Sequence, residues 1–423
     1  MSAPDFDSAA PRGDSGQRVI FVNRFYAPDQ SATAQILTDL AEYLAGRGWS
    51  VEVITSRLFH GAASASLVPH EIINKVLVRR VWTVSGVRLG LFGRFLAYLT
   101  FYASATLALL WHARPDTIIV AKTDPPLIGV LALGISWLRR ARLVNWLQDL
   151  YPEVAVQFGV PALRGPVSAV LMSLRDLSMR RAALNVAIGQ RMAGRIADRG
   201  VAEERIATIA NWTDDEAIQP STSNSLSLRK EWGLPRDAFV LEYSGNLGRV
   251  HEAETLLAAS ALLVDRHDIW FLFVGGGAAQ VDLAQRSVAA GRKRFVFQPH
   301  QPRTRLSESL AVGDAHWLSL RPEFEGLIVP SKVFGIAAAA RPIVAVCDLQ
   351  GEVALMIASS DAGIAVAPGD APGLAAAIVA LADDRAACRA MGDRARIMLQ
   401  QGFRRCSALA QWEQRLEQLV TGR

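Results

Sequence analysis

The chain has 423 residues, which exceeds the usual size of a single hydrophobic core, so we expect two domains. Half of its residues are hydrophobic and a fifth are charged, a balance that excludes disordered and fibrous classes. The net charge is +5, but residues 79–199 hold 16 Lys and Arg against 6 Asp and Glu, whereas residues 216–423 hold 22 of each. This basic first half favours an anionic partner: membrane lipid, a phosphate-bearing acceptor or nucleic acid.

Several classes of partner are not supported by motifs. No helix-turn-helix, zinc-finger or RNA-binding signature is present, so we do not expect nucleic acid. The three cysteines, Cys347, Cys388 and Cys406, are far apart and form no metal-ligand spacing, which favours a reducing, cytoplasmic compartment and no metal. Residues 1–17 are small and polar without the apolar core of a signal peptide, and we expect a disordered tail.

The first domain opens as a doubly wound α/β unit. Residues 19–22 and 51–55 are short apolar strands, and residues 31–46 between them have the apolar spacing of an amphipathic helix. Ser31 and Thr33 lie at the start of that helix, where Ser31 serves equally well as a plain helix cap. Residues 76–84 are a further strand.

Residues 95–111 contain no charged side chain. A membrane-spanning helix needs about 20 apolar residues, with a lower limit near 17. Because this segment includes several Tyr, Thr and Ser residues, we interpret it as a buried or interface-lying helix and leave insertion open. Four nearby arginines would suit anionic headgroups: Arg79, Arg80, Arg88 and Arg94.

Two further strands of this domain end in polar side chains. Residues 117–121 lead into Lys122 and Asp124, and residues 143–147 lead into Asp149, at the strand ends where open α/β sheets bind ligands. Asp149 can position an acceptor or accept its proton, although a strand-end cap is the alternative. Later elements are expected at these positions: helices at 127–138, 167–181 and 191–199, strands at 185–187 and 206–209.

The second domain is expected to open with a strand at 239–243 and a glycine loop. Gly245, Asn246, Gly248 and Arg249 follow this strand, and glycines let backbone amides approach a pyrophosphate that Arg249 could bind. The loop is not a GxGxxG fingerprint, and a bare structural turn is the alternative. Strands are expected at 269–274, ending in Gly275 and Gly276, and at 295–298, 316–320 and 363–366, with helices at 304–311, 372–381 and 406–420.

Residues 320–345 combine a loop, a helix and a strand. Glu325 and Gly326 precede Ser331, which can cap a helix, and Lys332, which lies in its first turn. A helix N-terminus favours an anion such as phosphate. A carboxylate for hydroxyls and a lysine for phosphate together suit a sugar attached to a pyrophosphate.

This stretch resembles the retaining glycosyltransferases of family 4, in particular the bacterial branch of exopolysaccharide and colanic-acid-type synthesis, in its Gly-Leu-Ile-Val-Pro-Ser-Lys run at 326–332. The resemblance extends over nearly the whole chain. It implies an α/β protein of the GT-B fold, with two Rossmann-like domains, a cleft between them and a C-terminal helix crossing back. The resemblance implies an acceptor domain at 18–212, a linker at 213–234, a donor domain at 235–402 and the returning helix at 403–423.

The resemblance also implies an activity and roles. The chain would be a metal-independent hexosyltransferase without cofactor, using a nucleotide-diphosphate sugar and a saccharide acceptor carried on a polyprenyl diphosphate at the inner face of the cytoplasmic membrane. The implied catalytic residues are Glu325 and Asp149. The implied donor-binding residues are Gly245, Asn246, Gly248, Arg249, Gly275, Gly276, Glu325, Gly326, Ser331 and Lys332. The implied acceptor-side residues are Ser31, Thr33, Lys122, Asp124, Asp149 and Glu153.

The sequence departs from the family at several positions. Gly335 stands where many relatives carry a second glutamate, which binds the ribose, and Asn246 and His251 replace an arginine and a lysine of the donor loop. The paired glycines usual in the family's first loop are also absent, at residues 25–28. These departures keep two alternatives open: another GT-B enzyme such as a nucleotide-sugar epimerase, and a non-catalytic nucleotide-sugar-binding subunit.

Overall fold

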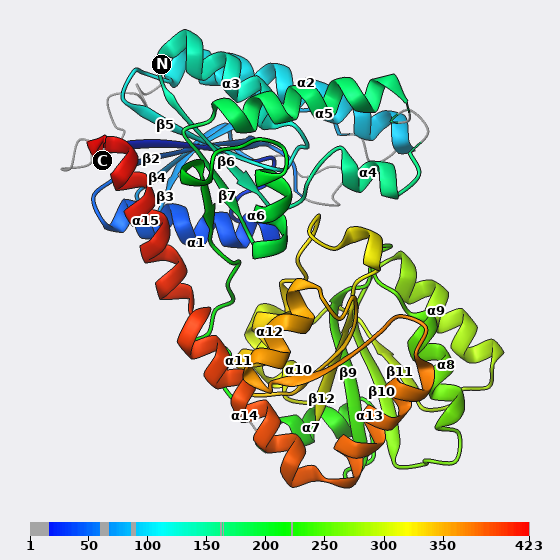
Figure 1. The fold of residues 1–423 in the computed structure, drawn as a ribbon. Helices are drawn as coiled ribbons and strands as arrows, with labels where there is room; N and C mark the ends of the chain where they lie inside the picture. Colours follow the sequence, from blue (N-terminus) through cyan, green and yellow to red (C-terminus); the bar gives the residue numbers. More distant parts are fainter. Residues whose placement is uncertain are drawn as a thin grey trace. The chain divides into compact units, whose positions relative to one another are not determined.

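The computed structural model describes residues 17–59, 67–85, 90–160, 163, 165–220 and 223–422 (Figure 1). The chain divides into two compact units: Met1–Ala210 with Leu409–Arg423, and Asn211–Ala408. We call these the first and the second unit. All of the expected tail except Gln17 lies outside the described residues, as does Arg88.

The first unit contains an eight-stranded sheet in the order β3-β4-β2-β1-β5-β6-β7-β8. All of its pairs are parallel except the one between β3 and β4. Its strands are β1 (Arg18–Val22), β2 (Ser50–Ser56), β3 (His70–Ile73), β4 (Val76–Val81), β5 (Thr117–Lys122), β6 (Arg142–Leu147), β7 (Leu184–Ala187) and β8 (Ile206–Thr208). Except for the edge strand β3, which is exposed or half-buried, the strands are largely buried, as expected of a parallel sheet covered by helices on both faces.

Helices cover both faces of this sheet (Figure 1). They are α1 (Ala32–Gly46), α2 (Gly90–His112), α3 (Ile128–Arg139), α4 (Glu153–Gln157), α5 (Pro166–Arg181) and α6 (Gln190–Ala197). On one face, Phe101 and Leu109 of α2 and Ala132 of α3 pack on Ile20 and Ile119 of the sheet. Helix α5 lies beside α3 on that side, and α1 lies on the opposite face (Figure 1).

The final helix, α15 (Arg405–Thr421), is part of the first unit from Leu409 onward. The rings of Trp412 and Trp146 have centroids 4.6 Å apart, and both side chains are fully buried. Glu413 accepts hydrogen bonds from the Tyr43 hydroxyl at 2.8 Å and from Arg47 Nε at 3.0 Å. These contacts confirm the prediction that the C-terminal helix returns to the first domain.

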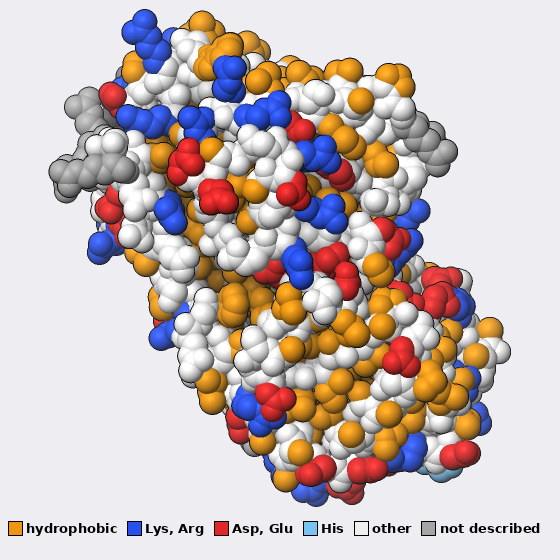
Figure 2. All heavy atoms as spheres, in the orientation of Figure 1, with side chains coloured by type: hydrophobic (Ala, Val, Ile, Leu, Met, Phe, Trp, Pro, Cys, Tyr) orange, Lys and Arg blue, Asp and Glu red, His pale blue; other side chains and the backbone are white. Residues whose placement is uncertain are grey.

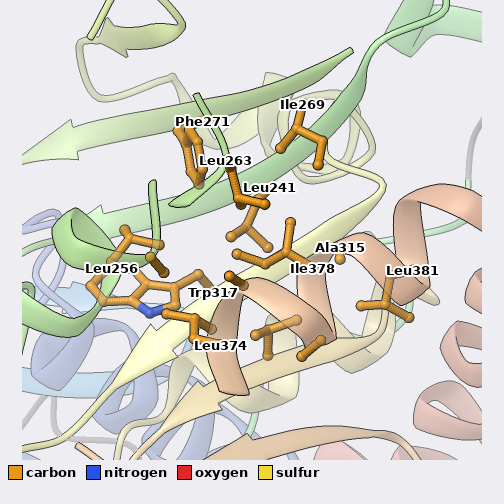
Figure 3. Close-up of a cluster of buried hydrophobic side chains, with 14 of the residues drawn as sticks. Leu241, Leu256, Leu263, Ile269, Phe271, Ala315, Trp317, Leu374, Ile378 and Leu381 are labelled. Carbon is orange, nitrogen blue, oxygen red and sulfur yellow. The ribbon is translucent and has the colours of Figure 1, made fainter. Parts of the chain in front are cut away.

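The second unit contains a wholly parallel six-stranded sheet in the order β11-β10-β9-β12-β13-β14. Its strands are β9 (Phe239–Asn246), β10 (Ile269–Gly276), β11 (Phe295–Gln298), β12 (Ala315–Ser319), β13 (Ile343–Val346) and β14 (Gly363–Val366). Figure 3 shows its core, where Trp317 and Leu241 of the sheet meet Leu256 and Leu374 from two covering helices. Two parallel α/β sheets, one in each unit, are the architecture predicted from the sequence.

The helices of the second unit are α7 (Ser223–Glu231), α8 (Glu254–Leu262), α9 (Ala278–Ala289), α10 (Leu306–Leu310), α11 (Lys332–Ala338), α12 (Glu352–Ser360), α13 (Ala371–Asp383) and α14 (Arg385–Gly402). The segment expected as a linker, residues 213–234, is structured in its second half. Leu228 of α7 and the following Trp232 and Leu234 are buried against Val240 and Leu272. This half is therefore part of the second unit's core.

Two arginines expected at lipid headgroups are instead buried in β4. Arg79 pairs with Glu52 at 2.6 Å, and Arg80 pairs with Glu71 and donates to the Ala27 carbonyl at 2.8 Å. That expectation was wrong for both residues, because their charges are neutralised inside the first unit.

Each sheet reverses its strand order beside its first strand. β1 lies between β2 and β5, and β9 lies between β10 and β12. Ligands of open α/β sheets bind outside the carboxyl ends of the strands at such a reversal. We therefore expect ligand-binding residues after β5 and β6 in the first unit and after β9, β10 and β12 in the second.

Candidate functional site

In the second unit, the ends of β9 and β10 are built from glycines. Gly245 pairs with Gly275 in the parallel register, and both have positive φ angles, +128° and +133°. A β-carbon on Gly275 would lie 2.2 Å from the Gly245 carbonyl oxygen. Only glycine fits such a position, and the two strand ends thereby expose backbone to a ligand.

Lys332 lies directly over this strand end. A β-carbon on Gly245 would lie 2.5 Å from Lys332 Cε, and the lysine Nζ is 5.3 Å from the centre of the Tyr243 ring. Burial lowers the pKa of Lys332 to about 8. The structure thus brings together Gly245 and Lys332, two predicted donor residues that are far apart in the sequence.

His251, which replaces a lysine of the family pattern, is buried against the same strand ends. Its Nδ1 donates to the Ser319 carbonyl at 2.6 Å, and its Nε2 lies 3.1 Å from the Tyr243 hydroxyl. Burial, followed by the nearby Lys332, lowers the pKa of His251 to about 4. The imidazole is therefore neutral at physiological pH, which leaves the positive charge here to Lys332.

Glu325 lies in the loop after β12 and is half-buried. Its Oε1 accepts a hydrogen bond from the Glu352 backbone N–H at 2.9 Å, at the start of α12. A β-carbon on Gly351 would lie 2.5 Å from Glu325 Oε2, so Gly351 makes room for the carboxylate. Burial raises the pKa of Glu325 above its usual range, against the effect of that hydrogen bond. The helix N-terminus thus fixes the orientation of the carboxylate.

The remaining predicted donor residues surround these. Asn246 and Arg249 are exposed, and Gly248 lies between them in the loop after β9. Gly326 is buried with φ +70° beside Glu325. Ser331 precedes α11, but its side chain makes no capping hydrogen bond, so the expected cap was wrong.

At Gly335, the position of the missing second glutamate, the structure leaves space. The nearest atom to a β-carbon there would be Leu310 Cδ1 at 3.8 Å, an ordinary contact distance. Gly335 is on α11, three residues after Lys332, so the two positions lie on the same face of the helix. A β-carbon at residue 335 would therefore meet no clash.

In the first unit, Asp149 lines a pocket after β6. The polar residues in its wall include Thr123, Asn145, Tyr151 and Arg175; its apolar wall comes from residues such as Leu127, Ile128, Leu147 and Met179. Burial, with a smaller effect of Asp124, raises the pKa of Asp149 to about 7. The carboxyl group can therefore hold or release a proton near neutral pH.

Two predicted acceptor residues are committed to the interior of the first unit. Lys122 is fully buried; its Nζ donates to the Thr33 carbonyl at 2.9 Å and lies 3.8 Å from the Trp146 ring centre. Glu153 accepts two hydrogen bonds from Arg175, at 2.9 and 2.6 Å. Neither side chain is exposed for an acceptor. Ser31 makes no capping bond to α1, although it precedes that helix.

Sequence analysis did not identify several residues of these sites. Tyr243 and Ser319 hold His251, and the exposed His300 has its ring over Gly275 and Gly276. Arg175 and Tyr151 complete the pocket around Asp149. Tyr151 and His300 could have been predicted, because they follow the ends of strands. The positions of Tyr243, Ser319 and Arg175 depend on tertiary packing. Among the described residues, no group of three or more His, Cys, Asp or Glu could hold a metal ion.

Comparison with known proteins identifies the family. Residues 33–217 match the profile of Glycosyltransferase Family 4, and residues 238–384 match that of the glycosyl transferases group 1. The chain is 26% identical to the probable glycosyltransferase WbjE of Pseudomonas aeruginosa over 62% of this chain and 66% of that protein. It is 25% identical to the putative colanic acid biosynthesis glycosyl transferase WcaI of Escherichia coli K12, over 74% of this chain and 79% of that protein.

Solved structures share the fold. Sucrose-phosphate synthase from Thermosynechococcus elongatus superposes with a TM-score of 0.73 at 18% identity, covering 96% of this chain and all of that one. HepE of Anabaena in complex with UDP gives 0.69 at 16% identity, covering 95% of this chain and 100% of that one. With these matches, the two parallel sheets and the returning helix, the chain belongs to the retaining glycosyltransferases of family 4, which have the GT-B fold and use nucleotide-sugar donors.

Proposed function

We propose that the protein transfers a hexose from a nucleoside-diphosphate sugar to a saccharide acceptor, with retention at the anomeric carbon. The observation that carries this proposal is the position of Lys332 over the glycine ends of β9 and β10. Accessible backbone beside a half-buried cation suits a diphosphate. The complex of HepE with UDP supports a nucleoside diphosphate as the donor's leaving group.

In this proposal the second unit binds the donor. Lys332 and Arg249 bind the diphosphate and stabilise the charge that develops on it as the glycosidic bond breaks. Glu325, fixed by the start of α12, accepts hydrogen bonds from sugar hydroxyls. The reaction then requires no metal ion, since the two cations supply the charge stabilisation.

The first unit binds the acceptor. Its pocket combines apolar walls with Asp149, whose pKa of about 7 lets it accept the proton of an acceptor hydroxyl. We propose a saccharide linked to a polyprenyl diphosphate in the synthesis of an exopolysaccharide, at the inner face of the cytoplasmic membrane. The similarity to WcaI, named for colanic acid biosynthesis, supports polysaccharide synthesis. An anionic surface is supported by the exposed arginines Arg94, Arg139, Arg140, Arg180 and Arg181.

The experiment is a transfer assay with the pure protein, EDTA and a panel of nucleoside-diphosphate hexoses, with acceptors extracted from a bacterial membrane. We expect release of one nucleoside diphosphate and a new glycosidic bond whose anomeric configuration, read by NMR, equals that of the donor. An inverted product would contradict the mechanism. Formation of an epimerised nucleotide sugar or of a free sugar would favour an epimerase. Donor binding without any turnover would favour a binding subunit.

A further inference from the structure

Helix α5 of the first unit buries polar residues and exposes apolar ones, which is the reverse of an ordinary surface helix. Its polar residues Arg175, Asp176 and Ser178 are buried against the protein, where Arg175 pairs with Asp176 at 2.7 Å. Its exposed stripe is apolar. That stripe consists of Val167, Val170, Leu174 and Leu177, exposed by 50, 58, 41 and 38%. The sequence predicted a helix at residues 167–181, but its periodicity could not show which side faces the solvent.

The exposed apolar surface continues over the neighbouring helices α3 and α2. On α3 it includes Trp137 and Leu138, which are 68 and 70% exposed. On α2 it consists of Phe92, Phe95, Leu99, Leu107 and Trp111. In Figures 1 and 2 these three helices lie along the top of the first unit, where hydrophobic side chains are interspersed with Lys and Arg. Contiguous apolar surface of this kind indicates an interaction site.

The charges on this surface have one sign. The sequences of α2, α3 and α5 contain a single carboxylate, Asp176, which is buried and paired. Exposed arginines border the apolar residues: Arg94, Arg139, Arg140, Arg180 and Arg181. The Arg181 guanidinium lies 6.0 Å from the Trp137 ring centre, so a cation and an indole stand together at the edge.

We propose that the exposed face of α2, α3 and α5 docks on an anionic lipid bilayer. Apolar side chains would enter the boundary of the acyl chains, exposed tryptophans would lie at headgroup depth, and the arginines would contact lipid phosphates. A protein partner would need carboxylates placed opposite each of these arginines. The surface of a bilayer rich in anionic lipid is negatively charged throughout and needs no such placement. This inference extends the proposed membrane location by naming the surface, and it does not depend on catalysis.

The same structure specifies how α2 meets the bilayer. Helix α2 contains the one described segment, Phe92–His112, that is long and apolar enough to cross a membrane. However, Ala97, Phe101, Ala105 and Leu109 on its other side are at most 1% exposed, and the last three pack on the sheet. Spanning would remove these side chains from the core, so α2 lies along the bilayer surface.

The test is flotation of the full-length protein with vesicles of phosphatidylcholine alone or mixed with phosphatidylglycerol. We expect the protein to float with the mixed vesicles at low salt, and to bind less at high salt and to phosphatidylcholine alone. The variant Arg94→Gln/Arg140→Gln/Arg181→Gln should lower the partition coefficient about a hundredfold, since each cation near the surface contributes about fivefold. The variant Trp137→Ser/Leu138→Ser/Val170→Ser should abolish flotation.

Matched controls are available in the second unit. Val281→Ser/Val288→Ser removes apolar side chains that are 59 and 77% exposed, and Lys293→Gln/Arg389→Gln removes exposed cations. These variants should float like the parent. Thermal unfolding and the binding of nucleoside diphosphates should be unchanged in every docking variant, which separates loss of docking from misfolding and from failure of the proposed donor site.

Three outcomes would overturn the inference. The parent could fail to float with anionic vesicles, or the docking variants could float as well as the controls. Light scattering could also show a dimer that these variants dissociate, in which case the face joins two copies of the chain. Carbonate extraction of native membranes addresses α2 separately: a docked protein is released, whereas retention in the membrane would show that the helix crosses it.

Discussion

The side chain of Lys332 crosses the strand end at Gly245 so closely that a β-carbon at residue 245 would lie 2.5 Å from Lys332 Cε. The lysine of α11 and the glycine of β9 are therefore in direct contact, although 86 residues lie between them in the sequence. The cation is held above exposed backbone, and the predictions for the donor site follow from this arrangement.

Replacing Gly245 by alanine should displace Lys332 and strain a backbone with φ +128°. We expect the affinity for a nucleoside diphosphate to fall by roughly tenfold or more. The free energy of unfolding should fall by about 1–3 kcal/mol. The matched control is Gly291→Ala, which also has a positive φ angle, +66°, but where the new β-carbon would meet nothing within 4 Å. Titration calorimetry measures both; equal affinities for the two variants would contradict the role of Gly245.

The affinity for a nucleoside diphosphate should depend on the charge of Lys332. Its pKa is lowered to about 8 in the folded protein, so the free site loses its positive charge as pH rises through that value. Binding should therefore weaken above about pH 8, and Lys332→Met should lower it by about tenfold to a hundredfold while removing this dependence. Calorimetry across this pH range provides the measurement. A pH dependence that persists in Lys332→Met would assign it to another group.

Asp149 should impose a pH dependence on transfer. Its pKa is raised to about 7, so the carboxyl is protonated below that pH and becomes a proton acceptor above it. We expect kcat/KM to rise with pH through about 7, and Asp149→Asn to be slower by about 10²–10⁴-fold without that rise. Donor binding should be unchanged in this variant. A pH profile for Asp149→Asn that matches the parent would leave Asp149 a positioning role only.

The same raised pKa affects stability. Between the unfolded pKa of 3.8 and about 7, the folded state holds a proton on Asp149 that the unfolded state has released. Stability should therefore fall as pH rises through this window, and Asp149→Asn should remove that part of the decline. Urea unfolding at several pH values measures it. A steeper decline in Asp149→Asn than in the parent would contradict the assignment.

Trp412 should be essential for the returning helix. It is fully buried and its ring lies 4.6 Å from that of Trp146, on which Lys122 Nζ also lies at 3.8 Å. Replacing Trp412 by alanine should destabilise the first unit by about 3–5 kcal/mol, because it leaves a large cavity. Glu413→Gln keeps the packing and should cost much less. Denaturant unfolding distinguishes them, and a small effect of Trp412→Ala would show that the helix is not firmly docked.

The sequence predicted the order of most strands and helices, because long apolar strands and amphipathic helices have clear periods. It missed β3, α4, α7, α9, α12 and α14, which we did not assign from the sequence. Of the candidate site, Glu325, Lys332 and the glycines were predictable from strand ends and a helix start. The burial of Lys122, Arg79 and Arg80 was not, because charged side chains enter a core only where tertiary partners satisfy them. The outward apolar stripe of α5 depends likewise on packing that periodicity does not reveal.

The central claim is a donor site for a nucleoside diphosphate in the second unit, and a thermal-shift screen tests it most directly. The parent protein and Lys332→Ala are compared in EDTA with UDP, GDP, ADP and CMP and with their sugars. We predict that one diphosphate class stabilises the parent, by about 2.7 kcal/mol at a hundred times its Kd, and that Lys332→Ala loses most of this effect. If no nucleotide stabilises the parent, or if Lys332→Ala responds equally, the account of the donor site is wrong.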